Sequence, residues 1–195
     1  MLALLKRTTR LVPFMPVAAL LFAACSENPL TVDRLAINAS SVHLKGGANA
    51  VPIFRDAGLS LAVSGALSGL GNGDVLVSLT ATANVKSTCT NQGGNAAPGQ
   101  NPAPTTVLGS VAIPASEIKN GTTPFAVTTR TPTTPIPGAP GCPNPNWSES
   151  IDDLAFTSAT ITVEQPAGTV VLTIQCSFST ATSDGSVAKN QVSCF

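Results

Sequence analysis

Apolar and polar residues alternate strictly over a dozen positions in the first half of this chain. Between Asp74 and Cys89, the odd positions from Val75 to Val85 are apolar, and the even positions up to Lys86 are mostly polar. Successive side chains of a β-strand point to opposite faces of the sheet, so a period of two separates the two sets. The segment therefore predicts a long strand with one buried face.

The rest of the chain favours the same class of fold. Charged residues make up 10% of the sequence, against about 25% in typical domains. Thr, Val, Ser, Gly, Pro and Asn are abundant, and this mixture suits strands joined by tight turns. Further strands are expected at 35–44, 59–67, 107–113, 125–129, 151–164, 169–178 and 187–195. Seven or eight short strands with turns between them predict an all-β fold, an antiparallel β-sandwich of immunoglobulin-like type.

Turn residues divide these strands. The glycine-rich run 68–73 lies between two apolar segments, so we expect 59–67 and 74–89 to form a hairpin. Residues 90–105 and 131–146 contain too much proline and glycine for regular structure, and we expect two long loops there. Loops carried by a rigid sandwich are common places for binding.

Residues 1–24 have the layout of a secretion signal. Lys6, Arg7 and Arg10 are followed by an uncharged, mostly apolar run from 11 to 24 that ends in small residues. The run is shorter than the ~20 apolar residues that a membrane-spanning helix needs. Residues 25–34 are polar and are expected to be a tether, and 35–195 to be a single domain that is best defined over 59–195.

The five cysteines support export. An odd count leaves one thiol over in an oxidising compartment, and modification of Cys25 would remove it. The other four allow three pairings, of which we favour Cys89–Cys142, joining the two loops, and Cys176–Cys194, closing a short C-terminal segment. A zinc site is the less favoured alternative, because no two cysteines have CxxC spacing and His43 is distant.

The charged residues exclude some functions. Without the signal, seven basic residues face ten acidic ones, and no basic stripe points to nucleic acid. We expect no enzyme activity, cofactor or metal. A hydrolase would depend on His43, the one histidine, or on Glu149 with Asp152. Asp152 and Asp153 are adjacent, so on a strand they would face opposite sides.

Recognition would depend on the loops. Trp147 is the one tryptophan; we expect it to be buried against a disulfide, and the alternative is an exposed ring that stacks on a sugar or anchors a partner. Polar loop residues complete the candidate binding set, which is Trp147, Asn144, Asn146, Asn95 and Gln100.

Two resemblances follow from local motifs. Leu21-Phe22-Ala23-Ala24-Cys25 resembles the lipobox of bacterial lipoproteins, which implies a lipid on Cys25 and anchorage to an envelope membrane. A general signal-peptidase cut after Ser26 is the alternative. The segments CTNQGGNAAPGQNP, IPASEIKNG and GCPNPNW resemble a group of small exported bacterial β proteins with no assigned activity. We therefore expect a cell-envelope binding or scaffolding lipoprotein, whose partner is an envelope protein or a glycan.

Overall fold

The computed structural model describes residues 41–47, 49–100, 102–134, 142 and 144–195. All the described residues belong to one compact unit. The expected secretion signal, Cys25, the tether and most of the 35–44 strand lie outside the described residues.

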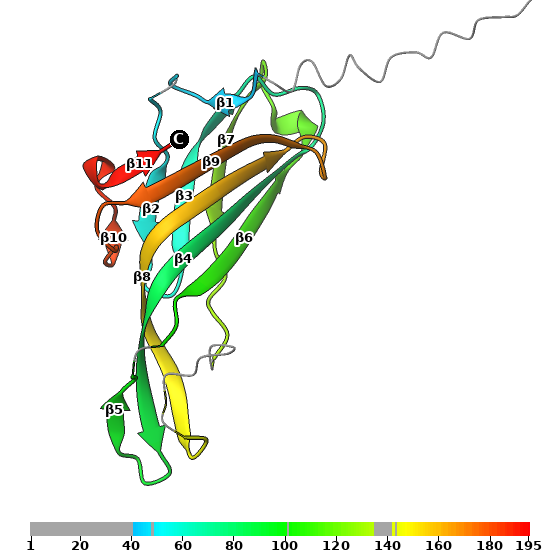
Figure 1. The fold of residues 1–195 in the computed structure, drawn as a ribbon. Coiled ribbons are helices and arrows are strands. Elements are labelled where there is room, and N and C mark those ends of the chain that lie inside the picture. Colours follow the sequence, from blue (N-terminus) through cyan, green and yellow to red (C-terminus); the bar gives the residue numbers. More distant parts are fainter. Residues whose placement is uncertain (1–40, 48, 101, 135–141, 143) are drawn as a thin grey trace, which may run out of the picture. The chain divides into compact units, whose positions relative to one another are not determined.

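Within the described residues, the strands form two antiparallel sheets (Figure 1). The first sheet contains β1 (His43–Leu44), β2 (Ile53–Asp56), β3 (Leu61–Ser68), β7 (Thr122–Thr128) and β10 (Gly185–Ser186). The second contains β4 (Val75–Asn91), β5 (Ala96–Pro98), β6 (Thr105–Ile113), β8 (Trp147–Glu164), β9 (Val170–Phe178) and β11 (Val192–Cys194). Two short 3₁₀ turns, η2 (Ala115–Glu117) and η3 (Lys189–Gln191), lie between strands.

The connectivity is that of an immunoglobulin-like sandwich. β2 and β3 pair in the first sheet, and the chain then crosses to β4 in the second. β7 returns to pair with β3, β8 pairs with β4, and β9 pairs with β8. This Greek-key order places the strands in two facing sheets. The predicted all-β antiparallel sandwich is confirmed.

The core lies between the two sheets and explains the alternation in the sequence. Val75, Val77, Leu79, Ala81 and Ala83 of β4 are all buried, as the period of two predicts. The cross-strand partners of the last four residues on β8 are buried as well, so the same buried face continues across the second sheet. Across the core, the rings of Phe54 and Phe178 lie edge to face, with centroids 5.2 Å apart. Such a pair is worth about 0.5–1.5 kcal/mol beyond its buried area.

The expected hairpin between 59–67 and 74–89 is wrong. β3 and β4 belong to different sheets, and the turn between them crosses the sandwich. Gln165 holds this turn: its Oε1 accepts from Gly71 N–H at 2.7 Å, and its Nε2 donates to the carbonyl oxygens of Gly71 at 3.0 Å and Gly73 at 2.6 Å. β3 and β4 each have one apolar face. Because the two strands lie in facing sheets, both apolar faces are buried against each other in the core.

Two other expectations need correction. Residues 90–105 are not an irregular loop throughout, because they include the end of β4 and the short strand β5. The expected last strand 187–195 is interrupted by η3, so β11 begins at Val192. Of the 131–146 loop, residues 135–141 and 143 lie outside the described residues.

Candidate binding site

β4 and β8 continue together beyond the point where their other partners leave them. β6 pairs with β4 as far as Ala83, and β9 pairs with β8 from Ser158 onward. Residues 84–91 of β4 nevertheless stay paired with 147–155 of β8, and β5 adds a third strand beside Thr88–Thr90. We call residues 84–98 and 144–155 the arm. Figure 1 shows the arm extending from the sandwich, with β5 near its far end.

A disulfide fastens the second loop to the arm. Cys89 and Cys142 are bonded, with an S–S distance of 2.04 Å, and Cys89 is buried. Cys176 and Cys194 are also bonded and join β9 to β11, where the two residues are direct cross-strand partners. Both favoured pairings are therefore confirmed. Two disulfides are typical of a protein that folds in an oxidising compartment outside the cytoplasm.

The tip of the arm is built from asparagine turns. Asn91 Oδ1 accepts from the N–H groups of Gly93 and Asn95, each at 2.9 Å, and this closes the turn between β4 and β5. In the same way, Asn144 Oδ1 accepts from Asn146 N–H at 3.0 Å, just before β8 begins. Asparagine side chains commonly replace backbone groups in such turns. Each side-chain oxygen is therefore used within its own turn.

Trp147 joins these two turns. It is the direct cross-strand partner of Asn91, and its backbone N–H donates to the backbone carbonyl oxygen of Asn144 at 3.1 Å. The side chain is half-buried, which lies between the expected burial and the exposed alternative. Full burial would need a covering layer. Trp147 instead lies at the last β4–β8 pair of the arm, beyond the sandwich core. Part of it faces solvent beside the amide groups.

Four of the five candidate binding residues therefore belong to one end of the arm. The exception is Gln100. It follows Gly99, whose N–H donates to Ser87 O at 2.7 Å, so Gln100 lies at the base of β5, away from the tip. Its side chain is exposed. The structure groups Trp147, Asn95, Asn144 and Asn146 and leaves Gln100 outside this group.

The carboxylates of the arm do not converge. Asp152 accepts from Thr88 Oγ1 at 2.6 Å and from Ser150 Oγ at 3.4 Å, which places these three side chains on one face. Glu149 pairs with Cys89 and alternates with Ser150, so it lies on the other face. Asp153 is likewise separated from Asp152 and faces Gly58. A groove of about 500 Å³ runs beside Asp152. It contains one carboxylate, whereas the chemistry of a glycosidase needs two.

His43 lies elsewhere. It is in β1, paired with Ser68 of the first sheet, and its Nδ1 is 2.6 Å from Ser41 O. The ring is exposed. Within the described ranges, no group of three or more His, Cys, Asp or Glu side chains lies close enough to hold a metal ion.

One carboxylate that the sequence analysis missed is buried. Asp56, at the end of β2, is 2% exposed. It accepts a hydrogen bond from Gly58 N–H at 3.0 Å and another from Thr182 Oγ1. Burial raises the pKa of Asp56, and the charges of Asp153 and Asp184 raise it further, while the two hydrogen bonds act in the opposite direction. The network ties the segment after β9 to β2. Nothing in the local sequence signals it, because the partners lie 126 residues apart.

Comparisons with models of protein families, with curated proteins and with solved structures gave no match to this chain. Among the residues that the structure describes, no helix has the length and apolar character needed to cross a membrane. The candidate site is a disulfide-fastened arm that ends in one aromatic ring and several amide groups.

Proposed function

We propose that this protein is a non-enzymatic lipoprotein of the bacterial cell envelope that binds a partner through the tip of its arm. A lipid on Cys25 anchors it, the tether 25–34 separates the domain from the membrane surface, and the arm presents Trp147 and its asparagine neighbours. The partner is an envelope protein or a glycan, and no cofactor is involved.

The observation that carries this proposal is the Cys89–Cys142 disulfide. It joins the second loop to β4 within the arm, and so brings Asn144, Asn146 and Trp147 to the same end as Asn91 and Asn95. Ordering these groups before binding lowers the entropy lost on association. Tryptophan is among the residues that most often dominate binding energy. A fastened, partly exposed tryptophan at the end of a rigid arm suits recognition.

The test is a crosslinking pull-down from the native envelope fraction. Wild type is compared with Trp147→Ala and with a matched control, Val170→Ala, which shortens an exposed apolar side chain of β9 outside the arm. We expect one partner to be recovered by wild type and the control and lost with Trp147→Ala. Recovery of the same proteins by all three baits would contradict the role of the arm.

The same preparation tests the anchor. The intact mass of the recovered protein should exceed that of the chain beginning at Cys25 by the mass of the attached lipid. A Cys25→Ser variant should be released from the membrane fraction. An unmodified mass with cleavage after Ser26 would overturn lipidation and leave the binding proposal standing.

A neutral glycan is the second candidate partner. Residues 87–99 and 144–148 carry no charged side chain, and Trp147 lies among amide groups. Aromatic rings stack on sugar faces, and amides bond sugar hydroxyls. Affinity electrophoresis through gels that contain neutral polysaccharides tests this candidate. Retardation that Trp147→Ala abolishes supports a glycan, whereas retardation that the variant leaves unchanged assigns the binding to another surface.

A further inference from the structure

The outer edge of β6 carries unpaired backbone groups. β6 pairs with β4 along one edge only. Its Leu108 C=O points to the other edge, where it accepts from Arg130 N–H at 2.8 Å. Because backbone direction alternates along a strand, the N–H and C=O of Thr106 point to that edge too. Within the described part of the chain, the Thr106 groups and Leu108 N–H have no hydrogen-bond partner there.

This edge lacks the features that usually prevent pairing. Natural proteins protect edge strands with charged residues, prolines, bulges or a covering segment. Residues 105–113 contain no charge and no proline. A covering segment crosses the edge at Leu108 and Gly109: Arg130 N–H bonds Leu108 C=O, and an added Cβ on Gly109 would lie 2.2 Å from Thr128 O. Beyond this crossing, towards Thr105, the edge opens again.

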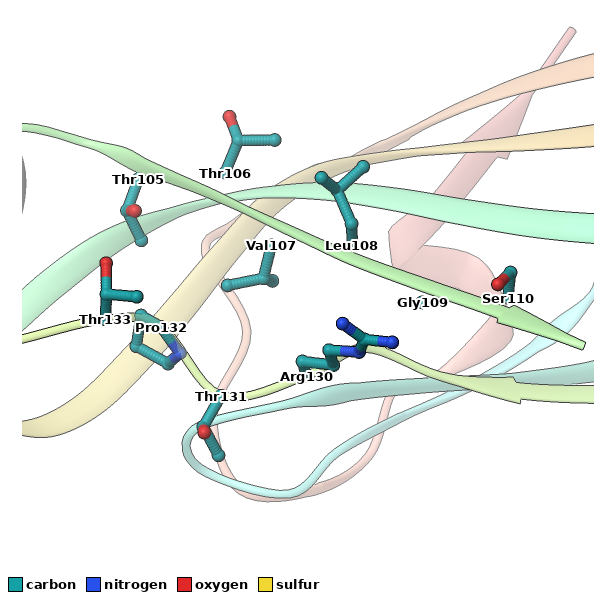
Figure 2. Close-up of a pocket in the computed structure, with 10 residues that line it drawn as sticks. All are labelled: Thr105, Thr106, Val107, Leu108, Gly109, Ser110, Arg130, Thr131, Pro132 and Thr133. Carbon is teal, nitrogen blue, oxygen red and sulfur yellow. The ribbon is translucent and has the colours of Figure 1, made fainter.

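A groove follows the open part of the edge. It has a volume of about 540 Å³ and lies between residues 105–110 of β6 and the segment 130–133. Figure 2 shows the Arg130 side chain lying between these two segments. Leu108, on β6, is 60% exposed. No described acidic residue forms an ion pair with Arg130, so its charge is available to a ligand.

We propose that this groove binds an extended peptide segment of a partner protein, which adds to β6 as a further strand. The N–H and C=O of Thr106 and the N–H of Leu108 bond the peptide main chain. The Leu108 side chain contacts an apolar side chain of the peptide, and Arg130 pairs with an acidic one. Strand addition of this kind takes its affinity from main-chain hydrogen bonds and its specificity from side-chain contacts.

The repeat along the edge favours a peptide over an acidic glycan. Outward-facing groups recur every second residue, about 6.6 Å apart, which is the repeat of another strand. A carboxylated sugar would satisfy Arg130 but has no matching row of donors and acceptors. The site goes beyond the proposed function, since it involves neither Cys25 nor Trp147.

The first test uses modified peptides and leaves the protein unchanged. The probe is a fluorescein-labelled heptapeptide of alternating threonine and valine with a central aspartate, and binding to the purified, disulfide-bonded protein is followed by fluorescence anisotropy. N-methylation removes one N–H at a time. We expect methylation at alternate positions to weaken binding at least tenfold, and methylation at the positions between them to have little effect. Equal effects at all positions, no binding, or equal competition by a polyuronate would overturn the proposal.

Protein variants supply the second test. Thr106→Pro removes an outward N–H, and Ala112→Pro does the same on the same edge outside the groove. Proline is tolerated where the N–H is not part of the ladder. We expect Thr106→Pro to weaken the probe at least tenfold and Ala112→Pro to leave it unchanged, with matching melting temperatures confirming that both fold. Arg130→Gln should abolish the preference for aspartate over asparagine in the probe. An unchanged preference, or binding lost in Trp147→Ala, would contradict the assignment.

Discussion

Gln165 offers the sharpest test of how this sandwich is held together. Its side chain is 7% exposed and makes three hydrogen bonds to the turn at 71–73. A net contribution of about 0.5–1.5 kcal/mol for each bond gives about 1.5–4.5 kcal/mol for the set. Gly71 and Gly73 are half-exposed, so water would replace part of this in Gln165→Ala. We therefore expect that variant to lose about 2–3 kcal/mol of unfolding free energy, or about 4–12 °C in melting temperature.

Gln165→Glu separates hydrogen bonding from side-chain size. The variant keeps the shape and the acceptor for Gly71 N–H, but places a carboxylate oxygen against the carbonyl oxygens of Gly71 and Gly73. Near neutral pH the two carbonyl oxygens would face the charged carboxylate, so the loss of unfolding free energy should exceed that of Gln165→Ala. At pH values below about 4 the acid is protonated and donates once, so the loss should shrink.

The assay is equilibrium denaturation of the oxidised protein near pH 7 and near pH 4. Gln175→Glu is the matched control, because Gln175 lies on β9 with an exposed side chain and should change stability by no more than about 0.5 kcal/mol. Losses below about 0.5 kcal/mol for both Gln165 variants, or a Gln165→Glu loss that is independent of pH, would refute the reasoning.

Three further predictions concern Asp56, Gly109 and Ser87. Burial raises the pKa of Asp56, so the folded protein disfavours the charged carboxylate, and stability falls as the pH rises from about 3.8 through the raised pKa. Asp56→Asn should remove this fall in stability. A denaturation pH profile that the substitution leaves unchanged would contradict the prediction. Gly109→Ala should cost about 1–3 kcal/mol in unfolding free energy, because the new Cβ meets Thr128 O at 2.2 Å. A melting temperature equal to that of wild type would show that the segment at Thr128 moves aside without a cost in stability. Ser87 Oγ is buried and has no hydrogen-bond partner among the described residues. Ser87→Ala should therefore match wild-type stability or exceed it by up to about 1 kcal/mol, and a loss above that size would show that the hydroxyl has a partner.

The sequence predicted strand faces much better than strand partners. Alternation identified the buried face of β4 from Val75 to Ala83, because burial on one face is all that a period of two records. It carries no information on which strand lies alongside. The expected hairpin failed for that reason: a glycine-rich turn permits a reversal within one sheet and a crossing between two sheets equally well. The choice depends on Gln165, which lies 94 residues from Gly71 in the sequence.

The candidate site shows the same division between local and distant information. Proline and glycine in 90–105 favoured a loop, yet Asn91 organises a tight turn there, and β5 pairs back onto β4. The exposure of Trp147 could not follow from its neighbours in sequence, since it depends on lying opposite Asn91 at the end of an arm whose other strand is 56 positions away. The cysteines did carry distant information, because only three pairings existed and one joined the two loops. Covalent links therefore predicted where the binding groups would meet, and non-covalent packing decided how far each would face solvent.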